Sequence, residues 1–274
     1  MSAPDPHVRE MPEEIVRLGD LTLVEYIRHI ARYGGKIVEE AGLVLVRGPH
    51  PQPNPFRNAA LRLTADLDPD AVLARGRALF ADRPSGFVLW CREHADGDLI
   101  AVAEELGLNE LERIPQLVMD AEALPPEKPL PEGVEVLRVG DAATQDDYLQ
   151  VVAAAWGMGN LPSPIAAQLF FDPRIATAPH SVGFVAYREG QPLCGVMAIA
   201  SHGSVLGTQG GTLEAARGLG LSQICLRLSL AHCIEHLGAQ RCFAQGSALG
   251  YPVWIKFGYV PYSGHRRFLV KAPA

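Results

Sequence analysis

The chain has 274 residues, 48% hydrophobic and 20% charged, with a formal net charge of −7. This composition is typical of a folded globular protein long enough for two domains. It argues against general nucleic-acid binding, which needs a basic face, and no apolar run is long enough to span a membrane.

The first half alternates short helices and strands. A Thr22-x-x-Glu25 capping box predicts a helix that begins there and ends at Gly34-Gly35. The other elements expected before residue 120 are strands at 37–39, 43–46, 58–63, 87–91 and 114–119, and helices at 69–80 and 98–106.

A proline-rich segment, 121–133, follows and predicts a linker, because proline continues neither a helix nor a central strand. We therefore expect one domain over 1–120 and a second over 134–274. In the second we expect strands at 134–137, 181–187, 194–200, 205–211, 241–245 and 267–270, and helices at 141–156, 164–171, 221–237 and 252–257.

The five cysteines are odd in number and show no C-x-x-C spacing. They predict buried thiols in a reducing compartment. The first residues, 1–6, lack the basic start and apolar core of a signal peptide. We therefore expect a cytoplasmic protein. The cysteines are Cys91, Cys194, Cys225, Cys233 and Cys242.

One stretch, 212–222, carries the clearest chemistry. A strand leads into Arg217-Gly218-Leu219-Gly220, and a long helix without proline follows. The two glycines let the backbone approach a ligand, and the first helical turn offers unpaired N–H groups. The helix dipole and Arg217 add positive charge, so the site suits a pyrophosphate. It is neither a Walker loop nor a three-glycine dinucleotide loop, since Gln223 stands at the third glycine position.

The run 212–220 (Thr-Leu-Glu-Ala-Ala-Arg-Gly-Leu-Gly) resembles the acyl-CoA loop of the GNAT superfamily of N-acyltransferases. Farther on, 247–259 is similar to that family's closing helix segment. The resemblance covers roughly 134–270. This sequence departs from the family's pattern at Ala215, where Gln or Arg is usual, and at Trp254, where the family usually has its Tyr general acid.

The resemblance implies an α/β (α+β) fold of two GNAT-like units, each a mixed, mostly antiparallel sheet flanked by helices. It implies an N-acetyltransferase that uses acetyl-CoA, without a metal, on a small-molecule or peptide amine, with no nucleic-acid or membrane partner, and it leaves room for a homodimer. The cofactor-binding residues it implies are Gly211, Thr212, Leu213, Arg217, Gly218, Leu219, Gly220, Leu221 and Ser222.

In the implied reaction the amine attacks the thioester carbonyl, and a strand N–H near Gly211 stabilises the oxyanion. The leaving sulfur needs a proton, and the Trp254 indole N–H does not supply one. Tyr251 and Ser247 are substitute candidates for the acid, beside Trp254 itself at the usual position. His202 and His180 are candidate bases for the amine, and the sequence does not choose between them.

The two halves share an order of elements, which predicts an internal duplication as in tandem GNAT proteins. The first half lacks the glycine loop and carries Asp66, Asp68 and Asp70 at the equivalent place. Their charge would repel a pyrophosphate, so we expect the N-terminal half to be a degenerate unit that is structural or shapes the substrate pocket.

Two other functions stay open. Trp254 and Ala215 favour a non-catalytic acyl-CoA-binding or regulatory module on the same fold. A scaffold that binds no coenzyme A ranks last, because Arg217-Gly218-x-Gly220 keeps the phosphate-binding chemistry.

Two metal-like patterns are better explained by ordinary helices. The segment His232-Cys-Ile-Glu-His236 matches an inverted zinc-protease pattern, but no Asp or Glu follows His236 in the chain. The segment from Asp66 to Asp70 has Ala71 and Arg77 where a calcium loop needs Gly and Glu. We expect helix-capping carboxylates there.

Overall fold

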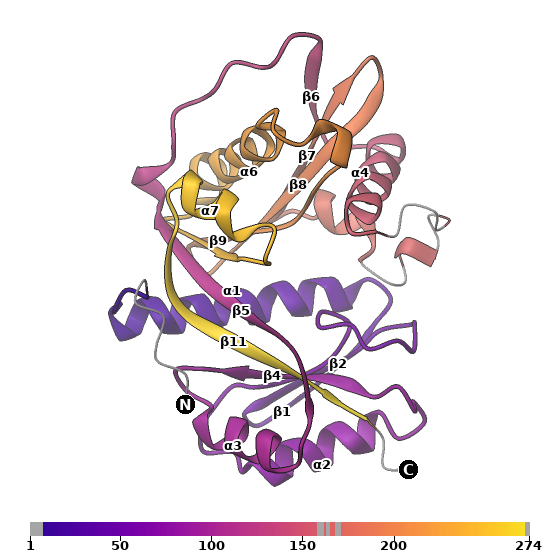
Figure 1. The fold of residues 1–274 in the computed structure, drawn as a ribbon, viewed down its shortest axis with the longest axis vertical. Coiled ribbons are helices and arrows are strands. Elements are labelled where there is room, and N and C mark those ends of the chain that lie inside the picture. Colours follow the sequence, from indigo (N-terminus) through magenta and orange to yellow (C-terminus); the bar gives the residue numbers. More distant parts are fainter. Residues whose placement is uncertain (1–7, 158–161, 163–164, 168–170, 272–274) are drawn as a thin grey trace.

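The computed structural model describes residues 8–157, 162, 165–167 and 171–271. Within these residues, eleven strands form one mixed sheet in the order β1-β2-β3-β4-β11-β5-β10-β9-β8-β7-β6 (Figure 1). None of the described helices is both long enough and apolar enough to cross a membrane. The helix predicted at 164–171 falls in part outside the described residues.

The first half of the chain supplies one end of the sheet. Strands β1 to β3 pair antiparallel, and β3 pairs parallel with β4. The elements are α1 (Glu13–Arg32), β1 (Lys36–Glu40), β2 (Leu43–Arg47), β3 (Asn58–Arg62), α2 (Pro69–Leu79), β4 (Phe87–Arg92), α3 (Gly97–Glu105) and β5 (Asn109–Asp120).

The second half repeats this order at the other end. Strands β6 to β9 pair antiparallel, and β9 pairs parallel with β10 through a crossover that contains α6. The elements are β6 (Val134–Arg138), α4 (Ala142–Ala155), β7 (Ser181–Arg188), β8 (Gln191–Ser201), β9 (Ser204–Thr212), α6 (Leu221–Leu237), β10 (Arg241–Gln245), α7 (Tyr251–Phe257) and β11 (Val260–Val270). The helix and strand predicted at 221–237 and 241–245 match α6 and β10.

The last strand of each half completes the sheet of the other half. Strand β5 pairs antiparallel with β10, and β11 pairs antiparallel with β4. The two exchanged strands also pair with each other and cross together between the halves (Figure 1). Both begin earlier than predicted, β5 at Asn109 rather than 114 and β11 at Val260 rather than 267. The fold is therefore the expected α/β class, but its two units share one sheet.

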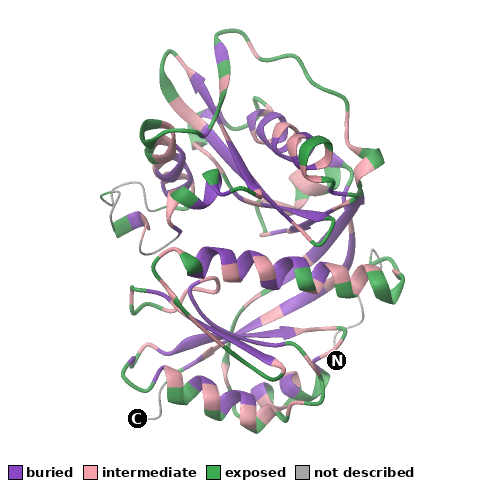
Figure 2. Ribbon diagram, turned by 180° about the vertical axis from the view of Figure 1, so that it is seen from behind, coloured by how far each residue is buried: buried purple, intermediate pink, exposed green. Residues whose placement is uncertain are grey.

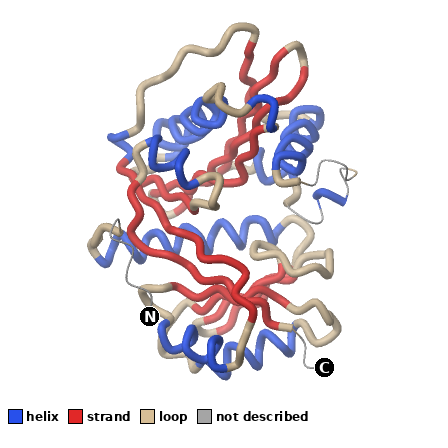
Figure 3. Tube along the Cα trace, viewed as in Figure 1, coloured by secondary structure: helices blue, strands red, loops and turns tan. Residues whose placement is uncertain are grey.

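Helix α1 lies between the two halves (Figure 3) and starts nine residues before the predicted capping box, at Glu13 after Pro12. The prediction was wrong because Thr22 is inside the helix. Its hydroxyl donates to the Leu18 carbonyl at 2.6 Å and contacts the Ser204 hydroxyl at 2.6 Å. That carbonyl lies four residues earlier, a bond that mid-helix Thr makes.

The core lies in three apolar clusters along the sheet, and the helices turn their buried faces toward it (Figure 2). The predicted stripe of α1 is part of it, since Leu23, Ile27 and Ile30 are buried. All five cysteines are buried and reduced, as expected.

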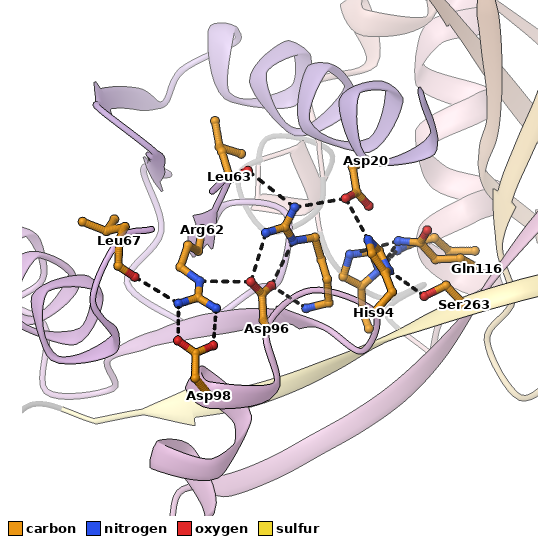
Figure 4. Close-up of polar contacts among 12 residues, drawn as sticks. Asp20, Arg62, Leu63, Leu67, His94, Asp96, Asp98, Gln116 and Ser263 are labelled. Carbon is orange, nitrogen blue, oxygen red and sulfur yellow. Dashed lines mark hydrogen bonds and ion pairs between the residues drawn. The ribbon is translucent and has the colours of Figure 1, made fainter. Parts of the chain in front are cut away.

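The N-terminal half also holds buried charges (Figure 4). Asp96 is fully buried and accepts from Arg62 Nε at 3.0 Å and Arg92 Nε at 2.9 Å. Arg92 also pairs with Asp20 of α1 at 3.1 Å. These ion pairs join β3, β4 and α1, because Asp96 pairs with Arg62 of β3 and Arg92 of β4, and Arg92 in turn pairs with Asp20 of α1. A buried carboxylate needs such charged partners.

His94 extends this network to β11 (Figure 4). Its Nε2 contacts Asp20 Oδ2 at 3.0 Å and its Nδ1 contacts Ser263 Oγ at 2.7 Å. The order Ser-His-Asp is that of a hydrolase triad. Here Asp20 is neutralised by Arg92, so we interpret the contact as a tie between α1 and the exchanged strand.

Candidate functional site

A cavity of about 870 Å³ opens where β9 and β10 part. Their parallel pairing ends at Gly207↔Ala244, while β9 continues to Thr212. The edge of 208–212 that faced β10 is therefore free for a ligand. The walls are β9, the loop and first turn of α6, residues 245–254, the end of α4, and two residues of the N-terminal half.

A bulge interrupts β9 at this point. The register with β8 shifts between Gly195↔Gly211 and Met197↔Thr208, and Gln209 has a φ of 45°. The Tyr148 hydroxyl donates to the Gln209 carbonyl at 2.8 Å. Bulges re-aim backbone groups next to active sites, and this side-chain bond fixes the bulge in the cavity wall.

Strand alternation decides which amides of β9 face the cavity. The Leu213 N–H donates to the Leu193 carbonyl of β8 at 2.9 Å. The amide of Gly211, two residues earlier, points the same way, and that of Thr212 points to the opposite edge. Thr212 is therefore the residue whose backbone faces the gap left by β10.

The loop and the start of α6 form the mouth of the cavity. Gly218 and Gly220 have φ values of 85° and 76°, a region that glycine enters without strain. Gly220 is the N-cap, and no side chain caps the helix. Within the described residues, the amides of Leu221 and Ser222 have no acceptor. They are free to bind an anion.

The amide of Arg217 is not part of this set. It donates to the Glu214 carbonyl at 3.1 Å, which closes a short 3-10 turn, Glu214–Ala216. The sequence placed Arg217 among the cofactor-binding residues, beside the unpaired N–H groups of the first helical turn. The backbone contribution is smaller, and Arg217 offers its exposed side chain.

Most of the predicted cofactor-binding residues meet at this cavity. Leu213 and Leu219 do not line it: the Leu213 amide is paired with β8, and the Leu219 side chain is 37% exposed. The predicted residues that line the cavity are Gly211, Thr212, Arg217, Gly218, Gly220, Leu221 and Ser222. Their binding role stays a prediction.

The three predicted catalytic residues separate. Ser247 and Trp254 line the cavity, whereas Tyr251 packs on the apolar cluster beneath α6. The ring of Trp254 lies against β9, where a Cβ at Gly207 would be 3.0 Å from it. A larger residue at Gly207 would therefore displace the indole from the wall.

Neither candidate base lies in the cavity lining. His202 is in the β8–β9 turn, at the opposite end of β9 from Thr212. The Nε2 of His180 contacts Nδ1 of His29 on α1 at 3.0 Å. The structure thus gives no support to either as a base.

The sequence missed the lining residues that come from other elements. Phe56 and Glu112 belong to the N-terminal half, Ala155 and Trp156 to the end of α4, and Gln245 ends β10. No local pattern marks them. The strand exchange brings Glu112 to this site, and that exchange is not visible in the sequence.

The metal-like patterns have structural explanations. Asp68 is the N-cap of α2 and accepts from the amides of Asp70 at 2.9 Å and Ala71 at 3.2 Å, as expected for a capping carboxylate. His232 and His236 are neighbours along α6, with ring centroids 4.6 Å apart. The part of the chain that the structure describes contains no group of three His, Cys, Asp or Glu side chains arranged to hold a metal.

Comparison with known proteins agrees with this geometry. Residues 128–246 match the model of the acetyltransferase (GNAT) domain family. No curated protein sequence matches the chain.

Solved structures share the fold over nearly the whole chain. A GCN5-related N-acetyltransferase from Kribbella flavida has a TM-score of 0.69 at 19% identity, over 94% of this chain and 95% of its own. One from Sphaerobacter thermophilus has a TM-score of 0.59 at 11% identity, over 85% and 82%. A tandem GNAT protein from the clavulanic acid biosynthesis pathway, solved without AcCoA, has a TM-score of 0.59 at 11% identity, over 93% and 96%. At such identities these structures show the fold alone.

Proposed function

Because residues 128–246 belong to the GNAT acetyltransferase family, we propose that the protein is an N-acetyltransferase that moves an acetyl group from coenzyme A to an amine. One observation carries the proposal. Unpaired amides at the start of α6 and two positive-φ glycines stand at the mouth of a cavity between parting strands. This arrangement suits a molecule with a diphosphate at one end and an extended chain at the other.

The cofactor would lie along β9. Its diphosphate would accept from the amides of Leu221 and Ser222, with the α6 dipole and the Arg217 side chain adding positive potential. The pantetheine arm would pair with the backbone of Thr212 as an added strand, in the place that β10 vacates. The thioester would then reach the bulge at Gln209.

In the reaction the amine lone pair attacks the thioester carbon, and a C–N bond forms as the C–S bond breaks. The predicted oxyanion donor was a strand N–H near Gly211; because the Gly211 amide points to β8, a backbone N–H of the bulged residues 208–210 would stabilise the oxyanion instead. The nitrogen loses a proton and the thiolate gains one. Trp254 has no transferable proton, but a thiol of pKa about 8.5 leaves without an acid. Ser247 is the predicted acid that lines the cavity with a hydroxyl.

Thermal unfolding with acetyl-CoA tests the proposal. A ligand at 100 times its Kd adds about 2.7 kcal/mol to stability, which raises Tm by roughly 5–10 °C. Gly218→Asp places a carboxylate at the phosphate and should abolish the shift. Gly190→Asp is the matched control, because Gly190 in the β7–β8 turn has a similar φ of 73° and equally open surroundings. An unchanged Tm for the natural chain would refute the proposal.

A non-catalytic acyl-CoA-binding module is the second candidate, and Trp254 at the usual acid position favours it. Release of free thiol from acetyl-CoA, with a panel of amines, separates the two. An amine that gives thiol at enzymatic rates excludes the module. The acceptor (small molecule or peptide), the homodimer and the cytoplasmic location stay predictions.

A further inference from the structure

The charge of the cavity is divided between its two ends. Among the residues that line it, Arg217 and Glu112 carry a formal charge. Arg217 is beside the start of α6, where the proposed function places the diphosphate. Glu112 is on β5, the strand that the N-terminal half inserts beside β10.

A buried arginine holds the Glu112 carboxylate in place. Arg267 of β11 is 4% exposed, and its Nη1 donates to Glu112 Oε1. Its Nη2 donates to Gln245 Oε1 at 2.8 Å. Gln245 is the last residue of β10, where that strand parts from β9. One guanidinium thus fixes the carboxylate beside the point where the thioester would end.

Two aromatic rings pack against the Arg267 guanidinium. The Arg267 guanidinium lies 3.7 Å from the centroid of Trp90 and 5.2 Å from that of Phe56. Burial lowers the pKa of Arg267 to about 10, so it stays charged at neutral pH. A molecule in the cavity meets Glu112 and Phe56, while Arg267 is enclosed.

A bulge gives Glu112 this position. The β5–β11 register shifts between Arg267↔Glu112 and Phe268↔Glu110, so Leu111 is an extra residue directly before Glu112. Glu110, on the other side of the bulge, pairs with Arg266 and does not line the cavity. Glu110 and Glu112 lie on the same strand and each pairs with its own arginine, but only Glu112 lines the cavity.

We propose that Glu112 and Phe56 form the acceptor subsite and bind an amine in its cationic, protonated form, which must release one proton to solvent before its lone pair attacks the thioester. The inference rests on the proposed function and adds the acceptor's charge class and the residues that select it. Within the described residues, Glu112 Oε2 has no hydrogen-bond partner, and the side chain is 39% exposed. A carboxylate oxygen only accepts hydrogen bonds, and an ammonium only donates them. The Phe56 ring adds a face that favours a cation.

Coenzyme A derivatives test the subsite without a known acceptor. S-(2-aminoethyl)-CoA and S-(4-aminobutyl)-CoA place an ammonium beyond the sulfur, and their S-hydroxyalkyl counterparts are neutral. We expect the natural chain to bind an amino derivative roughly tenfold or more tightly than its hydroxyl partner, as a charge-assisted hydrogen bond does. Calorimetry measures each Kd.

The variant Glu112→Gln should remove this preference and leave binding of acetyl-CoA unchanged. Glu110→Gln is the matched control and should keep the preference. An equal preference in Glu112→Gln, or none in the natural chain at either arm length, overturns the subsite while the proposed function stands. If no coenzyme A derivative binds to the natural chain, the proposed function fails first and the subsite falls with it.

Discussion

Helices α2 and α6 occupy the same place in the two halves, but their first turns differ. Each leaves a strand and leads to a strand parallel to it, β3 to β4 and β9 to β10. At α2, Asp68 accepts from two amides of the first turn, and Pro69 has no N–H to offer. At α6, the N-cap Gly220 has no side chain to accept from the first-turn amides, and Leu221 and Ser222 line the cavity. The difference is the capping carboxylate: Asp68 occupies the N-terminus of α2, whereas the N-cap of α6 has no such group and this helix end can accept an anion.

The N-terminal half contributes in another way. Its last strand, β5, completes the sheet beside β10 and carries Glu112 to the cavity, while Phe56 reaches the cavity from the loop before β3. A half without a phosphate site therefore forms part of the wall of the other half's cavity. This supports the proposed substrate-shaping role.

The largest expected effect concerns the buried ion pairs of the N-terminal half. Asp96→Ala should lower the free energy of unfolding by about 3–5 kcal/mol, because it leaves the buried Arg62 and the half-buried Arg92 without their shared carboxylate. Urea unfolding measures the loss. Asp98→Ala removes a carboxylate that is 51% exposed, so it should cost about 1 kcal/mol or less. Equal losses of stability in Asp96→Ala and Asp98→Ala would mean that burial of the carboxylate does not set the cost of removing it.

The second effect concerns the contact between α1 and the C-terminal half. Burial, together with the nearby charges of His180 and Arg32, lowers the pKa of His29 to about 4. The unfolded chain, with a His pKa near 6.5, binds the proton first as pH falls. The resulting loss of stability begins near pH 6.5 and is complete below pH 4, at about 2–3 kcal/mol.

The variant His29→Gln should flatten this pH dependence of unfolding in urea between pH 4 and 6.5. The exposed His236 provides the control, since His236→Gln should leave the slope as it is in the natural chain. A slope unchanged in His29→Gln would show that another group titrates.

The sequence predicted the elements whose signals are local. The glycines at 218 and 220, and the long helix after them, gave α6 and the mouth of the cavity, because turn geometry depends on adjacent residues. It placed the start of α1 wrongly, since a mid-helix Thr22 has the same spacing to Glu25 as a capping box.

The strand exchange was not predictable from these patterns. Strands β5 and β11 have the same alternation whether they pair within their own half or across. Glu112, Phe56 and Gln245 therefore carried no signal. Only the long-range pairing of Cys242 with Met119, and of Phe268 with Leu89, brings these residues to one site.

A smaller effect is expected at the N-terminus of α2, which Asp68 caps. Asp68→Ala should cost about 1 kcal/mol in thermal or urea unfolding, the usual value of an N-cap side chain. The Tm shift by acetyl-CoA should not change, because the cofactor is expected at α6. Asp66→Ala, two residues before the cap, should be nearly neutral. If Asp68→Ala altered the acetyl-CoA response, α2 would take part in binding and the contrast with α6 would fail.

The smallest expected effect concerns Trp254 and whether acetyl transfer in the C-terminal half depends on its indole N–H. Trp254→Phe removes the indole N–H and keeps an aromatic ring against Gly207 of β9. Because indole transfers no proton, the rate of thiol release with a reactive amine should change by about threefold or less, whereas loss of a general acid costs on the order of 10²–10⁴. Tyr251→Phe is the companion variant and should be equally mild, since Tyr251 packs outside the cavity lining. A hundredfold loss in Trp254→Phe, with acetyl-CoA binding intact, would show that the indole positions the thioester, so that the anion site alone does not explain the difference between the halves.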